Sequence, residues 1–152
     1  MIYKGEYLNE ISFPLGGIGT GSVGLAGNGS LVDFEIFNRP NKNSVNPFSF
    51  FAISAEYPDG KRVCKVLAGD VTKDLSGRHT EKAFTGFGFG PYDVTMCGFP
   101  HFKTVRFDGS FPIAKVTFSD ENFPAKVVME AFNPFIPQDA KNSSLPTAIF
   151  NL

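Results

Sequence analysis

The amino-acid sequence predicts an all-β protein, built as an antiparallel β-sandwich or barrel. Eighteen Phe and four Tyr residues favour sheets, because aromatic rings pack well on a pleated surface. Sixteen Gly and eleven Pro residues interrupt the chain at short intervals, which favours short strands over long helices. Short segments of alternating polarity also recur about every 8–12 residues between turn residues, which is typical of sandwiches and barrels.

The first alternating segment follows Asn28-Gly29, a strong signal for a β-hairpin. In residues 32–36 the two carboxylates, Asp33 and Glu35, share one face of the predicted strand, and apolar side chains share the other. The apolar side chains are those of Val32, Phe34 and Ile36.

Later segments repeat this alternation. They are residues 48–57 and 61–67, joined by a turn at 58–60, and residues 102–107, 111–118 and 125–132, joined by turns at 108–110 and 119–124. Every second side chain is apolar, and we expect these side chains to face the core: Phe51, Ile53, Ala55, Val105, Phe107, Ala114, Val116, Phe118, Val127, Met129 and Ala131. We find no helical periodicity, and residues 69–82 are predicted to form a polar excursion.

Residues 13–29, FPLGGIGTGSVGLAGNG, contain the fingerprint G-x-G-x-x-G at Gly19, Gly21 and Gly24, which brings a backbone close to a dinucleotide pyrophosphate. That function needs a buried strand before the glycines and a helix after them. Pro14 argues against the strand, and further glycines downstream argue against the helix. No Gly-Lys-Ser/Thr follows either. We therefore predict no nucleotide cofactor, and we assign the glycines to a tightly bent strand or a close backbone approach.

Composition narrows the range of partners. Fourteen basic and fifteen acidic residues leave a formal net charge of −1 without a block of like charge, so we expect no nucleic-acid partner. No stretch approaches the ~20 apolar residues of a membrane span. The N-terminus lacks the apolar region of a secretory signal, so a cytoplasmic location is expected. Cys64 and Cys97 are interpreted as two buried free thiols, with a disulfide as the alternative.

Few side chains are candidates for chemistry. Paired carboxylates act as acid and base when their pKa values differ, but we favour a solvated strand face for Asp33 and Glu35. His79 lies in a polar stretch, and His101 lacks the second pair of ligands that a zinc site requires. The sequence therefore predicts no catalytic residue, no cofactor and no metal ligand in this chain.

Two polar, proline-bearing stretches, residues 39–50 and 130–146, keep apolar residues at fixed points. Those residues are Phe48 and Phe50 in the first stretch, and Phe132, Phe135 and Ile136 in the second. One interpretation is a pair of ordered surface loops whose apolar side chains fold back onto the core. The other is a docking surface or the rim of a sugar site, where amide and hydroxyl side chains would meet hydroxyl groups.

Residues 13–42, FPLGGIGTGSVGLAGNGSLVDFEIFNRPNK, and residues 132–152, FNPFIPQDAKNSSLPTAIFNL, resemble the N-terminal domain of glycoside hydrolase family 116. This family includes the non-lysosomal glucosylceramidase, a bile-acid-type β-glucosidase, and the resemblance extends from Tyr7 to Leu152. It implies a supersandwich-like β-sandwich packed on a catalytic (α/α)6 barrel. Both carboxylates of the retaining mechanism belong to that barrel, so the resemblance implies a non-catalytic supporting part, with the β-glucoside bound through the barrel.

The resemblance implies a domain-interface or site-rim location for seven residues. They are Gly17, Gly19, Gly21, Phe132, Phe135, Ile136 and Asp139. Residues 143–152 begin a strand without closing it, so we expect residues 1–152 to be the N-terminal β-sandwich portion of a larger enzyme and the sandwich to be incomplete. A free-standing carbohydrate-binding module or a structural β-sandwich module is the alternative, and the absence of Trp counts against the first of these.

Overall fold

The structure is a computed structural model of the chain, and it describes residues 1–37, 39–42, 44–46, 48–70 and 98–152. A five-stranded antiparallel sheet forms one layer. Its strand order is β1 (Ile2–Lys4), β7 (Thr104–Ser110), β8 (Ile113–Ser119), β9 (Val127–Phe132) and β10 (Ile149–Asn151). There are two smaller antiparallel sheets. The first contains β2 (Ser12–Leu15), β3 (Ser22–Ala26) and β4 (Leu31–Glu35), and the second contains β5 (Ala52–Glu56) and β6 (Arg62–Val66).

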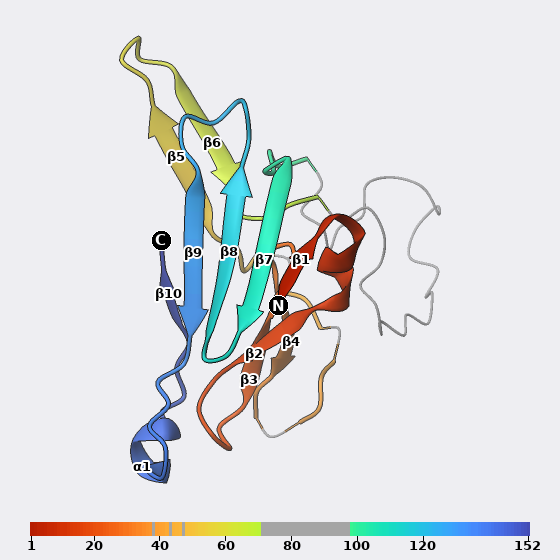
Figure 1. Cartoon of the computed structure of the whole chain (residues 1–152), viewed down its shortest axis with the longest axis vertical. Coiled ribbons are helices and arrows are strands. Elements are labelled where there is room, and N and C mark those ends of the chain that lie inside the picture. The colour runs from red at the N-terminus through yellow and green to blue at the C-terminus, as the bar shows by residue number, and fades with distance from the viewer. Residues whose placement is uncertain (38, 43, 47, 71–97) are drawn as a thin grey trace.

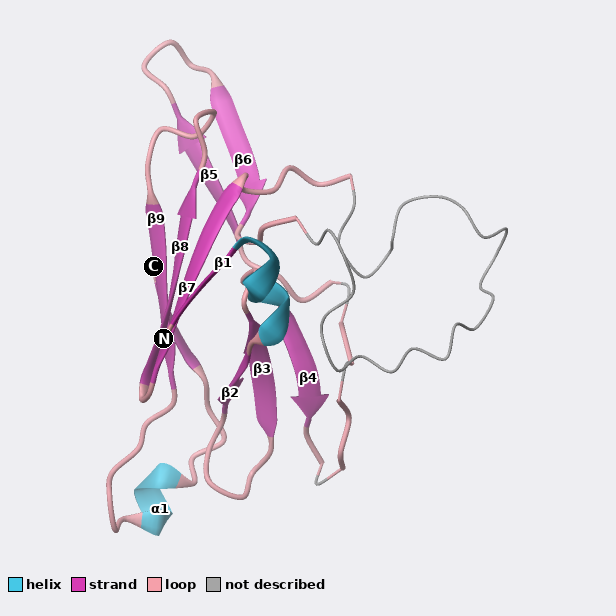
Figure 2. Cartoon of the chain, turned by 45° about the vertical axis from the view of Figure 1, so that its right-hand side comes forward, coloured by secondary structure: helices cyan, strands magenta, loops and turns pink. Residues whose placement is uncertain are grey.

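The two small sheets together form the second layer of a sandwich. Figure 1 shows the hairpin β5–β6 and the sheet β2–β3–β4 behind the five-stranded sheet, and Figure 2 shows the two layers from the side. The described strands form open sheets and not a closed barrel. The predicted all-β class and antiparallel sandwich are therefore confirmed.

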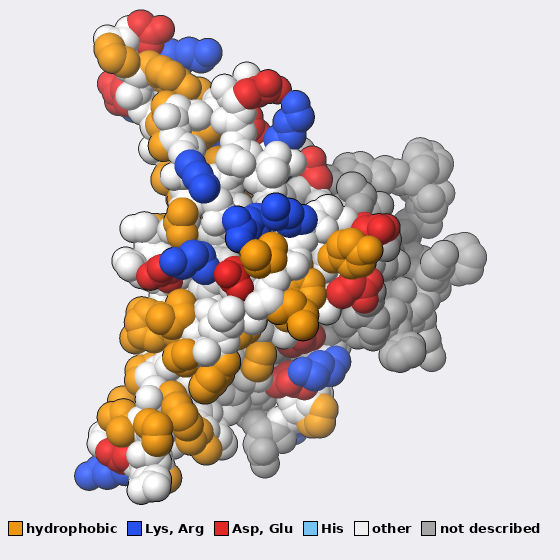
Figure 3. All heavy atoms as spheres, viewed as in Figure 1, with side chains coloured by type: hydrophobic (Ala, Val, Ile, Leu, Met, Phe, Trp, Pro, Cys, Tyr) orange, Lys and Arg blue, Asp and Glu red, His pale blue; other side chains and the backbone are white. Residues whose placement is uncertain are grey.

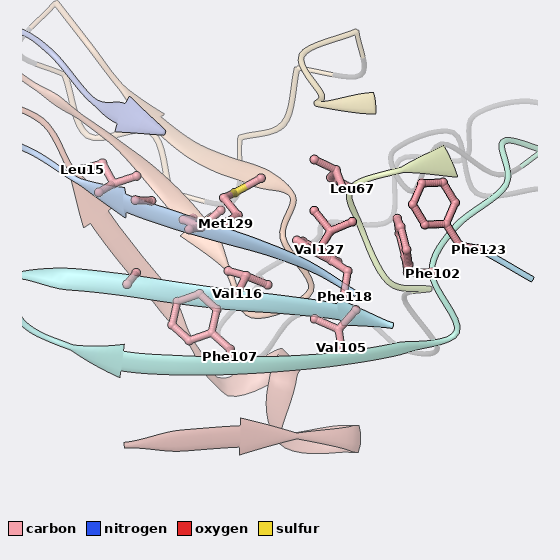
Figure 4. Packing of buried hydrophobic residues seen from close by; sticks show 13 residues of the cluster. Leu15, Leu67, Phe102, Val105, Phe107, Val116, Phe118, Phe123, Val127 and Met129 are labelled. Carbon is pink, nitrogen blue, oxygen red and sulfur yellow. The ribbon is translucent and has the colours of Figure 1, made fainter. Parts of the chain in front are cut away.

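The core lies between the two layers. From the five-stranded sheet, Phe107, Val116, Phe118 and Met129 are fully buried, and they meet Leu15 and other side chains of the facing layer (Figure 4). The alternation predicted for residues 102–132 is confirmed, because the buried side chains of β7, β8 and β9 occupy every second position. Phe51, Ile53 and Ala55 pack against the same core, as predicted.

The predicted hairpin at Asn28-Gly29 is confirmed. Gly29 has a φ of 93°, and its N–H donates to the carbonyl oxygen of Ala26. Asn28 is buried and its side-chain amide donates to the Gly69 carbonyl oxygen over 3.2 Å, while the Gly69 N–H donates to the Asn28 carbonyl oxygen. The turn thereby also fixes the chain that follows β6.

Three local predictions are wrong. The turn expected at 108–110 lies at Phe111 and Pro112, because residues 108–110 pair with both β8 and the N-terminus, where Gly109 N–H donates to the Met1 carbonyl oxygen. Cys64 is exposed, since β6 presents Val63 to the core and its neighbour to solvent. Two short helices also form, a 3-10 helix at Gly5–Glu10 and α1 at Ala140–Ser143. His79, Cys97 and most of the excursion at 69–82 lie outside the described residues.

The expected solvated position is wrong for Asp33, whereas the contacts of Glu35 are exposed. The pairing register of β3 with β4 shifts between Ser22 and Gly24, which is a β-bulge, and Asp33 there has a φ of 51°. The bulge interrupts the alternation, so Asp33 is buried and accepts a hydrogen bond of 2.7 Å from the Ser12 hydroxyl. Ile36, expected on the apolar face, is instead exposed.

A buried ion pair connects the two layers of the sandwich. Lys65 on β6 and Asp120 after β8 lie 2.8 Å apart, and neither side chain is more than 10% exposed. Asp120 also accepts hydrogen bonds from the backbone N–H groups of Lys103 and Asn122, and Lys65 donates to the His101 carbonyl oxygen. The hydrogen bond from Lys65, with those backbone donors, lowers the pKa of Asp120 to about 2.

We expect this ion pair to make the stability of the fold depend on pH in acid. Because the pKa of Asp120 lies below its ordinary value of about 3.9, its carboxylate stabilises the fold above pH 4, and this contribution is lost as the pH falls from about 4 to about 2. Asp120→Asn should therefore lower the urea midpoint at pH 7, and the difference from the parent should shrink below pH 4.

The control is Glu121→Gln, which removes an exposed ion pair with Lys103. It should change the urea midpoint little at any pH, because exposed pairs contribute little. A difference between Asp120→Asn and the parent that persists unchanged at pH 2 would contradict this account.

Candidate functional site

The two stretches that carry the family resemblance meet at one end of the sandwich. The turn from β2 to β3, residues 16–21, lies against the connection from β9 to β10, residues 133–148. The Ile18 N–H donates to the Ser143 carbonyl oxygen over 2.9 Å. A side chain at Gly17 would overlap the Leu145 carbonyl oxygen, so only glycine permits this approach of the two backbones.

Close packing also explains Gly21, whereas Gly19 supplies only a positive φ. Gly21 has a φ of 95°, and a Cβ atom there would lie 2.8 Å from the Glu35 carbonyl oxygen. Gly19 has a φ of 71° and faces open space at the tip. The fingerprint G-x-G-x-x-G leads into strand β3 and not into a helix, so it has none of the helix N–H groups that bind a pyrophosphate. The predicted close backbone approach is confirmed.

Residues 133–148 form an ordered connection organised by Ser143. This buried side chain accepts a hydrogen bond from the Ile136 N–H over 2.9 Å and donates to the Ile136 carbonyl oxygen over 3.0 Å. Asp139 caps α1 by accepting the Asn142 N–H, and this backbone hydrogen bond lowers the pKa of Asp139. The connection is therefore held in one conformation by its own polar groups.

We call the contact between residues 16–21 and residues 133–148 the junction. Around it, apolar side chains face solvent. We call them the end surface: Ile18, Phe111, Phe135, Ile136 and Leu145. Phe111 is 73% exposed and Phe135 43%, and their ring centroids lie 5.8 Å apart in an edge-to-face arrangement. Figure 3 shows hydrophobic side chains gathered at this end of the molecule, around α1. Exposed apolar patches of this kind are typical of interaction sites.

Five of the seven predicted interface residues lie at the junction, and two lie outside it. Gly17, Gly21, Phe135, Ile136 and Asp139 lie in or beside the junction. Gly19 stands at the tip, and Phe132 is half-buried on β9 opposite Ile149. Their role at an interface remains a prediction.

The sequence analysis missed three exposed apolar residues at this end of the sandwich. Ile18 and Leu145 flank positions that were noticed for glycine or proline, and Phe111 was expected inside a strand. Phe48 in the other stretch does not fold back onto the core, since it is 89% exposed.

The carboxylates of this end are occupied by local contacts. Glu35 forms an ion pair of 2.7 Å with Lys42, and this hydrogen bond lowers the pKa of Glu35, while Asp33 is buried on Ser12. His101 lies elsewhere, with its Nδ1 atom 3.3 Å from Asp70. Within the described part of the chain, no three His, Cys, Asp or Glu side chains are grouped closely enough to hold a metal ion.

The fold and the end surface define a β-sandwich domain with an exposed apolar end. Residues 12–152 match the family model of the N-terminal domain of beta-glucosidase 2, glycosyl hydrolase family 116, and the chain belongs to this family. The resemblance noted in the sequence is thereby confirmed. No curated protein matched the chain. Among the described residues, no helix has the length and apolar character needed to cross a membrane.

We expect Gly17 to be needed for the junction because of the space it leaves. Gly17→Ala should lower the free energy of unfolding by about 1–3 kcal/mol, since the added methyl group overlaps the Leu145 carbonyl oxygen and one backbone must move. Gly19→Asn is the matched control, because position 19 is open and Asn is one of the few residues that adopt a positive φ, so its loss should be smaller than that of Gly17→Ala. Urea unfolding measures both, and equal losses would contradict the steric explanation.

Proposed function

We propose that this chain is the non-catalytic N-terminal part of a β-glucosidase of the glucosylceramidase-like type. In this proposal it packs against a catalytic (α/α)6 domain of the same polypeptide and supports it, and that domain binds the β-glucoside. The family match supports the glycoside hydrolase part of this proposal. The end surface supports the packing part, and it is the single observation that carries it.

The state of the acidic groups at this end also supports a supporting role. Retaining hydrolysis needs two carboxyl groups about 5–5.5 Å apart, one of which has a raised pKa so that it donates a proton. The pKa values of Glu35 and Asp139 are lowered instead, by hydrogen bonds from Lys42 and from the Asn142 N–H respectively. Carboxylates stabilised in the charged form are poor general acids.

The apolar character of the end surface favours its burial against protein over its exposure to water. Leaving a large aliphatic or aromatic side chain in water forgoes about 1.5–3 kcal/mol of burial free energy. Phe135 and Ile136 are 43% and 50% exposed, on a connection whose backbone is held by Ser143. An ordered apolar surface gives docking at a small cost in conformational entropy.

The experiment tests docking in the full-length polypeptide that contains this chain. Phe135→Ala with Ile136→Ser should loosen the docked domain and lower hydrolysis of an aryl β-glucoside. It should also allow trypsin to cleave after Lys141, which lies on α1 between Ile136 and Ser143, two residues joined by a hydrogen bond. The parent should resist cleavage there.

Ile2→Ser is the matched control, because Ile2 is 52% exposed but lies on β1 at the edge of the five-stranded sheet. It should leave both cleavage and hydrolysis unchanged. Parent protein that is cut after Lys141 as fast as the double variant would show that no domain covers this connection. Binding of glucose to the 152-residue chain alone would instead favour a carbohydrate-binding module.

A further inference from the structure

A small socket opens beside the end surface, where three segments meet. It has a volume of about 120 Å³. The turn from β2 to β3 forms one wall, Ile36 after β4 forms the second, and the chain leading into β10 forms the third. The lining residues are Leu15, Gly16, Thr20, Gly21, Ser22, Val23, Ile36, Pro146, Thr147 and Ala148.

The socket is preformed because backbone contacts fix its walls. A Cβ atom at Gly16 would overlap the Gly21 carbonyl oxygen, and one at Gly21 would lie 2.8 Å from the Glu35 carbonyl oxygen. The glycines thus bring the β2–β3 turn onto the end of β4 and leave no side chain to fill the space. The hydrogen bond from Ile18 N–H to Ser143 and the turn bond from Thr147 N–H to the Leu145 carbonyl oxygen hold the third wall.

The lining chemistry favours an apolar occupant. It contains no charged and no aromatic side chain. Its three hydroxyl side chains are those of Thr20, Ser22 and Thr147, and the Thr20 hydroxyl already donates to the Gly17 carbonyl oxygen, while the other side chains of the lining are apolar. Sites for small molecules usually have about 300–1,000 Å³, which is well above this volume. A cavity of about 150 Å³ in another protein holds one benzene molecule. The socket therefore has room for one side chain, and its volume lies below the range usual for small-molecule sites.

We propose that the socket receives one aliphatic or aromatic side chain presented by the catalytic part of the enzyme, and that this side chain anchors the docking of the two domains. The inference rests on the proposed function and adds the anchor point to it. The arrangement is that of an interface hot spot, a small pocket surrounded by apolar groups that exclude water. Here the surrounding groups are Ile36 and Leu145, which are 43% and 51% exposed, and neither carries charge that would repel an apolar partner.

Thiol labelling of the full-length polypeptide tests whether the socket is covered. The background carries Cys64→Ser and Cys97→Ser. Ile36→Cys places a thiol in the socket wall, and Ile2→Cys is the matched control, since the two isoleucines are similarly exposed in this chain. We expect a maleimide to label Ile36→Cys at least tenfold more slowly than Ile2→Cys.

Filling the socket tests whether the anchor occupies it. Ser22→Leu places a larger side chain at a lining residue, and Ser54→Leu makes the same change on exposed β5. Added to Ile36→Cys, Ser22→Leu should raise the labelling rate at least fivefold and Ser54→Leu should not. Thr147→Leu, at another wall, should act like Ser22→Leu and serves if Ser22→Leu fails to fold.

Each outcome decides the inference. Equal labelling of Ile36→Cys and Ile2→Cys overturns it, and so does slow labelling that neither leucine variant accelerates. Protection of Ile36→Cys by added glucose overturns it in favour of a sugar subsite. In these cases the proposed function still stands if Phe135→Ala with Ile136→Ser exposes Lys141 to trypsin, and it fails if that double variant behaves like the parent.

Discussion

The approach of two backbones at Gly17 determines how this end of the molecule is built. A turn of the small sheet and the connection into β10 come close enough for Ile18 N–H to reach the Ser143 carbonyl oxygen at 2.9 Å, and any side chain at position 17 would prevent it. The contact joins the two layers of the sandwich beyond the core. It also places apolar side chains from both layers on one surface, so the end surface and the socket both depend on it.

Strands with one buried face were predictable because their pattern has a period of two. Within the predicted segments 102–107, 111–118 and 125–132 apolar and polar side chains alternate, and β7, β8 and β9 bury the apolar ones between the layers. The hairpin at Asn28-Gly29 was predictable for a different reason, since Gly readily adopts the positive φ that the turn needs. Both predictions rest on local rules that tertiary structure did not override.

The bulge at Asp33 and the junction were not predictable in detail, because they depend on contacts between distant segments. One extra residue in β4 turns Asp33 to the interior, where the Ser12 hydroxyl satisfies its carboxylate, and no local pattern announces that. The glycine-rich turn was predicted to lead into β-structure and not into a helix, and β3 follows it. Its partner, the carbonyl of Ser143, lies more than a hundred residues away in sequence, and only the fold brings them together.

The way the connection 133–148 is held has a consequence for the proposed docking. Its apolar residues Phe135 and Ile136 are displayed by a backbone fixed through Ser143, Asp139 and the prolines at 134, 137 and 146, so little freedom remains to be lost when a partner binds. A mobile loop with the same side chains would lose conformational entropy on docking and bind more weakly. The polar groups of this end therefore act on the proposed interface indirectly, because their hydrogen bonds are made inside the connection and the outward surface is left apolar.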